Sequence, residues 1–140
     1  GFNNHMGSRF TQNSELLQAV VEEAFKIDWL ILDSLTHPRS VFADLAREQG
    51  IPALKRDVFL DVVKEVDAIY FQIKKAERIA LQRGRAIAIG HPYQETLKAL
   101  QRYQANRDER VRVVPISAHA PGASQWMVDS APLDSTAISR

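Results

Sequence analysis

Cysteine is absent from this sequence of 140 residues, and so is any long apolar run. The absence of cysteine excludes disulfide scaffolds and thiolate metal sites, although it does not fix the cellular compartment. A helix that crosses a bilayer needs about 18 to 20 apolar residues, and no run in the sequence approaches that length. The sequence therefore predicts no membrane span, and it contains no recognisable signal peptide.

An excess of charge of either sign is also absent. The sequence has 18 Lys and Arg against 17 Asp and Glu, which gives a formal net charge of +1. No strong field draws nucleic acid or anionic lipid, so we predict no nucleic-acid partner. Hydrophobic residues make up 45% and charged residues 25% of the chain, close to the averages of folded domains. This composition excludes a disordered, collagen-like or coiled-coil chain.

The sequence alternates between segments whose apolar residues have helical spacing and short apolar segments typical of strands. Apolar spacing predicts helices over 14–27, 40–49, 66–83 and 94–104. Short apolar segments predict strands near 29–32, 53–56, 86–89 and 111–116. This alternation predicts an α/β fold with parallel strands, arranged as a sheet or a barrel. The segment 119–140 is rich in Ala, Ser and Pro, lacks a period, and is predicted to be a loosely ordered tail.

Polar residues with useful chemistry recur where the predicted strands end. They are His5, after a possible strand at the N-terminus, then Asp33 and Ser34, then Asp57, and then His91. The carboxyl ends of parallel strands open onto one face of a sheet or barrel, and active sites lie on that face. We therefore expect these side chains to converge on one rim.

Each of these residues also has a purely structural interpretation. Asp33 and Asp57 are suitable helix N-caps in loops that follow strands. His91 precedes a proline and suits a turn, and Arg56 suits an ion pair with Asp57. The His-Met-Gly-Ser run that starts at His5 is also what cloning sites leave behind, although here Gly-Phe-Asn-Asn precedes it. Spacing alone leaves these alternatives open.

Several segments of the chain form a more specific pattern. They are GFNNHMGSRFT at 1–11, ILDSLT at 31–36, KRDVFLD at 55–61, AIAIGHPYQET at 86–96 and VVPIS at 113–117. In this order they resemble the divergent polysaccharide deacetylases, a bacterial branch of the carbohydrate deacetylase superfamily, and this resemblance argues against a cloning origin of His5. The sequence departs from the family pattern at Leu35, where arginine is usual, and at Val62, where asparagine is common.

The resemblance implies a distorted (β/α) barrel of the glycoside hydrolase and deacetylase type. Residues 1–118 match the C-terminal part of that barrel. The family's early Asp-Asp strand end and a further His have no counterpart in this sequence, so the implied metal site is incomplete here. Open strand edges of such a partial barrel would favour self-association.

The resemblance also implies metal-dependent removal of acetyl groups from a carbohydrate of the cell envelope. A divalent metal, typically Zn²⁺, would polarise the acetyl carbonyl and lower the pKa of a bound water. His5 is the candidate metal ligand, and His91 is the candidate general acid that protonates the leaving group. Asp57 is the candidate base, or the group that orients an imidazole. The candidates for substrate contacts, or for support behind the site, are Asn4, Asp33, Ser34 and Arg56.

Two functions are therefore considered. The first is a zinc-dependent carbohydrate deacetylase, periplasmic or secreted, with the 140-residue chain inactive on its own. The second is a non-catalytic envelope protein that keeps the barrel and binds a glycan or a partner. An Asp-Asp strand end and a signal peptide encoded upstream of Gly1 would favour the enzyme. The sequence has no Gly-x-Ser-x-Gly motif or phosphate loop to support an unrelated hydrolase or phosphotransfer fold.

Overall fold

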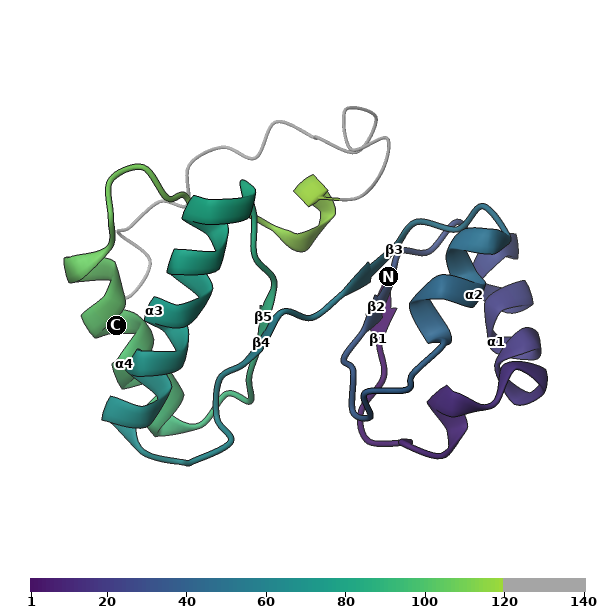
Figure 1. Cartoon of the computed structure of the whole chain (residues 1–140), viewed down its shortest axis with the longest axis horizontal. Coiled ribbons are helices and arrows are strands. Elements are labelled where there is room, and N and C mark those ends of the chain that lie inside the picture. The colour runs from purple at the N-terminus through teal and green to yellow at the C-terminus, as the bar shows by residue number, and fades with distance from the viewer. Residues whose placement is uncertain (120–140) are drawn as a thin grey trace, which may run out of the picture.

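The computed structural model describes residues 1–119. The strands are β1 (Phe2–Asn3), β2 (Ile31–Asp33), β3 (Ala53–Lys55), β4 (Val58–Phe59) and β5 (Ala88–Ile89). The helices are α1 (Ser14–Lys26), α2 (Phe42–Glu48), α3 (Val66–Arg83) and α4 (Gln94–Asn106). Short 3₁₀ turns cover Phe10–Gln12 and Ile116–His119. Strands and helices alternate along most of the chain, as the sequence predicts (Figure 1).

The strands form two small parallel sheets. β2 lies between β1 and β3, with Ile31 aligned to Phe2 on one side and to Ala53 on the other. β4 pairs with β5, with Val58 aligned to Ala88. Figure 1 shows α1 and α2 covering the first sheet and α3 and α4 covering the second. Parallel strands joined through helices confirm the predicted α/β fold.

The helix ends follow local sequence signals. Asn13 caps α1, because its Oδ1 accepts a hydrogen bond from the Leu16 amide at 3.1 Å. Gly50 and Gly84 follow α2 and α3 with φ angles of 79° and 82°, in the left-handed region where glycine carries no steric penalty. The range of α3 coincides with its prediction, α1 ends one residue early, and α2 begins late, at Phe42.

Each sheet has its own apolar core. In the first core, Leu17, Ile31 and Phe42 are almost fully buried among α1, α2 and the β1–β3 sheet. In the second, Val58 and Ile69 are buried among α3, α4 and the β4–β5 sheet. Burial of each large apolar side chain contributes about 2 kcal/mol. These cores hold the strands, and hence the residues that follow them, in place.

The predicted strand at 111–116 is wrong. Residues 111–115 belong to no strand, and Val113 is 70% exposed. Within residues 1–119 no strand pairs with this segment, and Pro115 has no amide hydrogen to donate to a ladder. The apolar residues of this segment line a groove instead of a sheet.

The chain changes sheets at Arg56 and Asp57. The Arg56 amide donates to the Asp33 carbonyl at 3.0 Å, beside β2. The Asp57 amide donates instead to the Ile87 carbonyl at 2.8 Å, beside β5. The strand predicted near 53–56 is therefore followed by a second strand, β4, that the sequence analysis missed.

The sequence also predicts that the chain has no membrane span and that residues 119–140 form a loosely ordered tail. None of the helices within residues 1–119 combines the length and the apolar content of a membrane span. The predicted tail, 119–140, lies outside the described residues except for His119, and it stays a prediction.

Glu77 on α3 is a buried carboxylate that joins two parts of the second core. Its oxygens accept hydrogen bonds from the Lys74 ammonium and, at 3.0 Å, from the Asp108 amide. Burial acts to raise the pKa of the Glu77 carboxyl, but hydrogen bonds from Lys74, Asp108 and Tyr103 together lower it. In its ionised form Glu77 therefore ties the turn after α4 to α3.

We expect the stability of the chain to depend on ionised Glu77. A carboxyl with a depressed folded-state pKa stabilises the fold above its ordinary pKa of 4.5, and this contribution is lost as the pH falls through the folded-state pKa. Glu77→Gln should lower the free energy of unfolding at neutral pH by about 1–3 kcal/mol. It should also flatten the loss of stability below pH 4.5, and urea titrations at several pH values measure both effects. Glu48→Gln, at an exposed position on α2, is the control, and an equal change there would contradict this account.

Candidate active site

His91 and Asp61 form a hydrogen-bonded pair at the carboxyl ends of β5 and β4. The His91 Nδ1 lies 3.0 Å from the Asp61 Oδ2, and the His91 amide donates to the same oxygen. The Asp61 side chain is fully buried, whereas 35% of the His91 side chain is exposed. The other oxygen, Asp61 Oδ1, is buried without a hydrogen-bond partner within residues 1–119. The contact with Asp61 thus fixes the Nδ1 side of the imidazole, while part of the His91 side chain stays exposed.

The pairing of β4 with β5 brings these two residues together. Both strands run in the same direction, so the residues that follow each strand leave the sheet at the same end. Gly90 permits a close approach there, because a Cβ on it would lie 3.1 Å from the Leu60 Cβ. A Cβ at position 90 would therefore require the Leu60 side chain to shift by a few tenths of an ångström.

His5 and two aromatic side chains surround the His91 ring. The His5 and His91 rings meet edge to face, with 5.5 Å between their centroids. The Phe59 and Tyr93 rings lie 5.7 Å and 5.2 Å from the His91 ring. We call His5, Phe59, Asp61, His91 and Tyr93 the rim cluster. Because His5 follows β1 and His91 follows β5, the rim cluster joins segments from both sheets.

The rim cluster contains the groups needed for proton transfer. A carboxylate at Nδ1 orients an imidazole and stabilises its protonated form. The Nε2 atom can then exchange a proton with a bound molecule within hydrogen-bond reach. The arrangement supports general acid–base chemistry at His91, with Asp61 as the residue that positions it.

Asn4 and Ser34 link the loops that follow β1 and β2. The Ser34 amide donates to the Asn4 Oδ1 at 2.8 Å. The Asn4 Nδ2 donates to the Thr36 hydroxyl at 3.4 Å. The Asn3 Nδ2 donates to the Ser34 hydroxyl at 3.0 Å. These hydrogen bonds hold the loop that carries His5 against the neighbouring loop.

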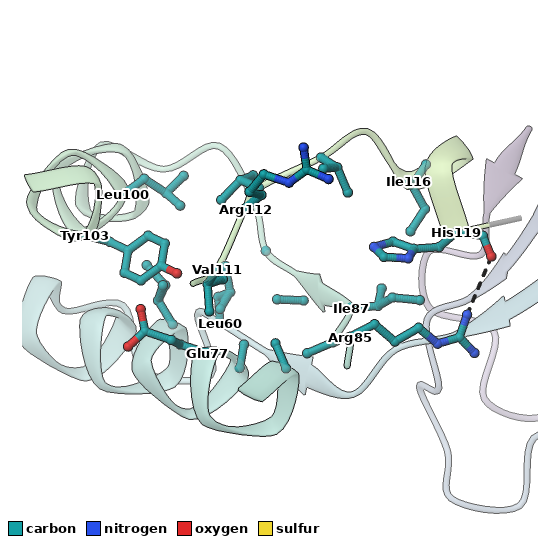
Figure 2. A pocket seen from close by; sticks show the side chains of 18 of the residues that line it. Leu60, Glu77, Arg85, Ile87, Leu100, Tyr103, Val111, Arg112, Ile116 and His119 are labelled. Carbon is teal, nitrogen blue, oxygen red and sulfur yellow. Dashed lines mark hydrogen bonds between the residues drawn. The ribbon is translucent and has the colours of Figure 1, made fainter. Parts of the chain in front are cut away.

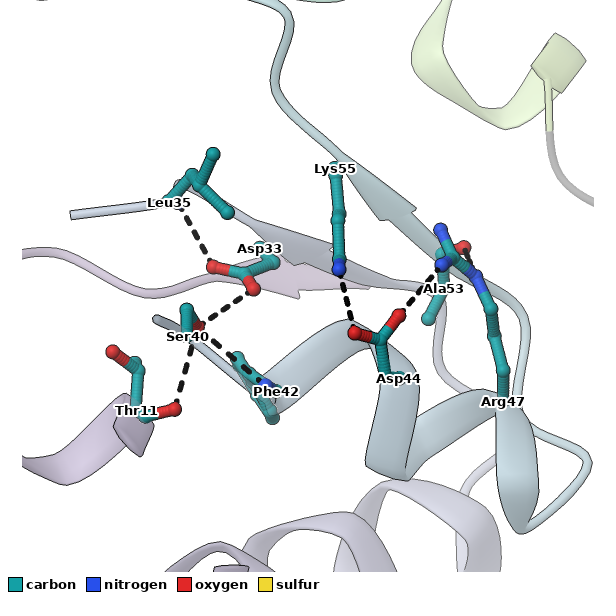
Figure 3. A network of polar contacts seen from close by, with 9 residues as sticks. All are labelled: Thr11, Asp33, Leu35, Ser40, Phe42, Asp44, Arg47, Ala53 and Lys55. Carbon is teal, nitrogen blue, oxygen red and sulfur yellow. Dashed lines mark hydrogen bonds and ion pairs between the residues drawn. The ribbon is translucent and has the colours of Figure 1, made fainter. Parts of the chain in front are cut away.

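Asp33 is fully buried at the end of β2. Its Oδ1 accepts a hydrogen bond from the Leu35 amide at 2.8 Å, and its Oδ2 accepts one from the Ser40 hydroxyl at 2.7 Å (Figure 3). Leu35 has a φ angle of 51°, which residues with a Cβ seldom adopt. The Asp33 carboxylate therefore closes the loop between β2 and α2, and the structure does not bring it into the rim cluster.

Arg56 supports the same loop from the side of β3. Its Nε donates to the Ser34 carbonyl at 2.6 Å, and its Nη2 donates to the Leu35 carbonyl at 2.8 Å. Its guanidinium lies 5.3 Å from the centre of the Phe59 ring. Burial lowers the pKa of Arg56, and the nearby Asp33 carboxylate opposes that shift. Arg56 thus connects the loop after β2 to the rim cluster.

Asp57 lies at the opposite end of β4 from Asp61. Its Oδ2 accepts a hydrogen bond from the Ile87 amide at 2.8 Å, and its Oδ1 lies 3.9 Å from the Arg83 Nη1. The structure therefore does not bring Asp57 into the rim cluster. Asp61 was not singled out from the sequence, although it ends the KRDVFLD motif, because that reasoning lacked β4 between the two carboxylates.

Comparison with known proteins connects this arrangement to a family. A family model described as divergent polysaccharide deacetylase matches residues 1–120. The chain belongs to the divergent polysaccharide deacetylase family. The predicted resemblance is therefore confirmed, and the parallel strands and alternating helices agree with the deacetylase-type fold.

Two relatives of this chain are uncharacterized bacterial proteins. One from Haemophilus influenzae is 38% identical over 114 residues, which cover 81% of this chain and 41% of that protein. The uncharacterized protein YibQ of Escherichia coli is 34% identical over 118 residues, which cover 84% of this chain and 37% of YibQ. A crystal structure of an uncharacterized protein from Agrobacterium tumefaciens matches with a TM-score of 0.81 and 27% identity, over 85% of this chain and 49% of that one. The chain thus spans about two fifths of the length of these curated relatives.

The sequence analysis predicts a metal site that includes His5. Within these residues, no group of three or more His, Cys, Asp or Glu side chains is arranged to hold a metal ion. In the rim cluster, Asp61 and the His91 Nδ1 already bind each other, which leaves His5 as the candidate ligand. The described residues alone do not fit the metal.

Proposed function

We propose that this divergent polysaccharide deacetylase contributes the acid–base part of a site that removes acetyl groups from a carbohydrate of the cell envelope. The His91–Asp61 pair is the observation that carries the proposal. An accessible imidazole held 3.0 Å from a buried carboxylate is oriented to donate a proton to a bound molecule. Family membership supports the general class, a hydrolase that acts on carbohydrate.

His91 has a defined task in the proposed reaction. Water adds to the acetyl carbonyl carbon, and the bond from that carbon to the sugar nitrogen or oxygen breaks. The leaving atom takes a proton from the His91 Nε2, one proton of the water replaces it on His91, and acetic acid departs with the oxygen and the other hydrogen of the water. Asp61 holds the imidazolium in position and offsets its charge before the transfer.

The remaining polar residues hold the site in shape in this proposal. Those that support the loops after β1 and β2 are Asn4, Asp33, Ser34 and Arg56. We assign the orientation of the imidazole to Asp61 rather than to Asp57, because Asp61 contacts His91 and Asp57 binds the Ile87 amide.

We further propose that the complete site uses a divalent metal, Zn²⁺, with His5 as a ligand and the other ligands outside residues 1–119. Such an ion would polarise the acetyl carbonyl. We also propose that the protein acts in the periplasm or outside the cell, where envelope carbohydrate is found.

A non-catalytic glycan-binding protein on the same fold is the second candidate, because residues 1–119 hold no complete set of metal ligands. The deciding experiment measures acetate release from partly acetylated oligosaccharides by the protein at its native length, with Zn²⁺ and after treatment with a chelator. We expect release that requires Zn²⁺ and is abolished by the chelator. Oligosaccharide binding without any acetate release would favour the second candidate and contradict the proposal.

A further inference from the structure

A groove of about 600 Å³ lies between α3, α4 and the segment 110–119 (Figure 2). Its volume falls within the range of sites that bind small organic ligands, roughly 300–1,000 Å³. One end of the groove reaches Gly90 and Pro92. Of the rim cluster, only His91 contributes to its lining, so the groove is largely separate from the candidate active site.

Apolar side chains line the groove and are exposed within it. Leu81, Leu97, Leu100 and Ile116 each keep between 38% and 45% of their surface exposed. Single exposed leucines are ordinary on a protein surface, but a contiguous group marks a place where an apolar partner binds. An occupant with a hydrocarbon body would bury this surface.

Positive charge predominates around the groove. Arg85 and Arg112 line it, and the Arg85 Nη1 donates to the His119 carbonyl at 3.5 Å (Figure 2). Among residues 1–119, neither arginine forms an ion pair with a carboxylate. The lining acid, Glu77, is buried and paired with Lys74, so it does not neutralise them. The groove is therefore complementary to an anionic group.

Two further polar groups belong to the lining. Arg110 is held by both carboxylate oxygens of Asp108, at 2.7 Å and 3.0 Å, and adds no free charge. Thr96 is only 4% exposed, and its hydroxyl has no hydrogen-bond partner within residues 1–119.

We propose that this groove binds a single-chain anionic amphiphile, a fatty acid. Its hydrocarbon chain would lie against the exposed leucines, and its carboxylate would pair with Arg112, which lies across the groove from Arg85 (Figure 2). The two arginines would repel a cationic headgroup, and an uncharged headgroup would lack the ion pair. The groove adjoins the rim cluster only at His91, and the leucines and the arginine that would hold the fatty acid lie outside that cluster.

Calorimetric titration with laurate, dodecyltrimethylammonium and dodecanol compares three headgroups on the same hydrocarbon chain. We expect laurate to bind with one-to-one stoichiometry and about tenfold more tightly than either of the others, a difference of about 1.4 kcal/mol. Equal affinity for all three amphiphiles would overturn the proposal, and so would the absence of laurate binding.

A substitution that fills the groove tests whether laurate binds there or at another apolar surface. Leu100→Trp should abolish laurate binding, whereas Leu16→Trp, at an exposed leucine of α1, should leave it unchanged. Circular dichroism verifies that both variants fold. Sedimentation provides the remaining test, because a dimer that Leu100→Trp dissociates would assign the groove to a second copy of the chain and overturn the proposal.

A second variant removes the charges and keeps the apolar walls. Arg85→Gln combined with Arg112→Gln should weaken laurate binding about tenfold and reduce the preference for laurate over dodecanol. Arg9→Gln combined with Arg39→Gln removes the same charge from exposed positions outside the groove and should have no effect. Equal weakening in the two double variants would show a non-specific charge effect and overturn the proposal.

Discussion

Replacement of His91 by alanine should lower kcat for acetate release about 10²- to 10⁴-fold, the usual contribution of a positioned proton donor. The variant lacks the imidazole that Asp61 holds at 3.0 Å, so the leaving group must take its proton from water. The Zn²⁺ content should stay close to that of the unmodified protein. Steady-state kinetics and metal analysis of the native-length protein measure the two quantities.

Two companion variants separate the roles within the rim cluster. Asp61→Asn keeps the imidazole but removes the charge that stabilises its protonated form, so kcat should also fall, by about 10²-fold or more, with Zn²⁺ retained. His5→Ala should instead lower the Zn²⁺ content. Equal loss of metal in His5→Ala and His91→Ala would show that the roles are assigned incorrectly.

Asp33→Ala should lower the free energy of unfolding by about 2–4 kcal/mol, because two donors lose their acceptor at once. The Leu35 amide and the Ser40 hydroxyl both bind this buried carboxylate. Leu35 would also lose the hydrogen bond that accompanies its φ angle of 51°. Urea denaturation followed by circular dichroism measures the change.

Asp44→Ala is the matched control for Asp33→Ala, and both carboxylates appear in Figure 3. Asp44 pairs with Lys55 at 2.7 Å and with Arg47 at 3.2 Å, but 52% of its side chain is exposed. Exposed ion pairs of this kind contribute only about 0–1 kcal/mol. If Asp33→Ala proves as stable as Asp44→Ala and loses acetate release, then Asp33 acts on the substrate rather than on the loop.

Local chemistry was sufficient to predict the helices and the fold class. Asn13 caps α1 and Gly84 ends α3 through contacts within a few residues, so their sequence neighbourhood contains the whole signal. The apolar run at β2 is buried or half-buried where it was expected, whereas in β5 Ala88 is exposed and Ile89 is half-buried. The order of the motifs also identified the family, which the match over residues 1–120 confirms.

Pairing between distant segments was beyond the reach of the sequence. Strand propensity is weak and depends on a neighbour, so the Val-rich segment 111–116 forms no strand where none of the described strands pairs with it. For the same reason the short strand β4 was missed, since β5 stabilises it from about thirty residues away. The family resemblance implied Asp57 as the base or as the group that orients an imidazole, but the parallel pairing of β4 with β5 brings Asp61 to His91. The helices depend on contacts along the chain, whereas the proton-transfer pair depends on the register between two strands, and that register exists only in the folded protein.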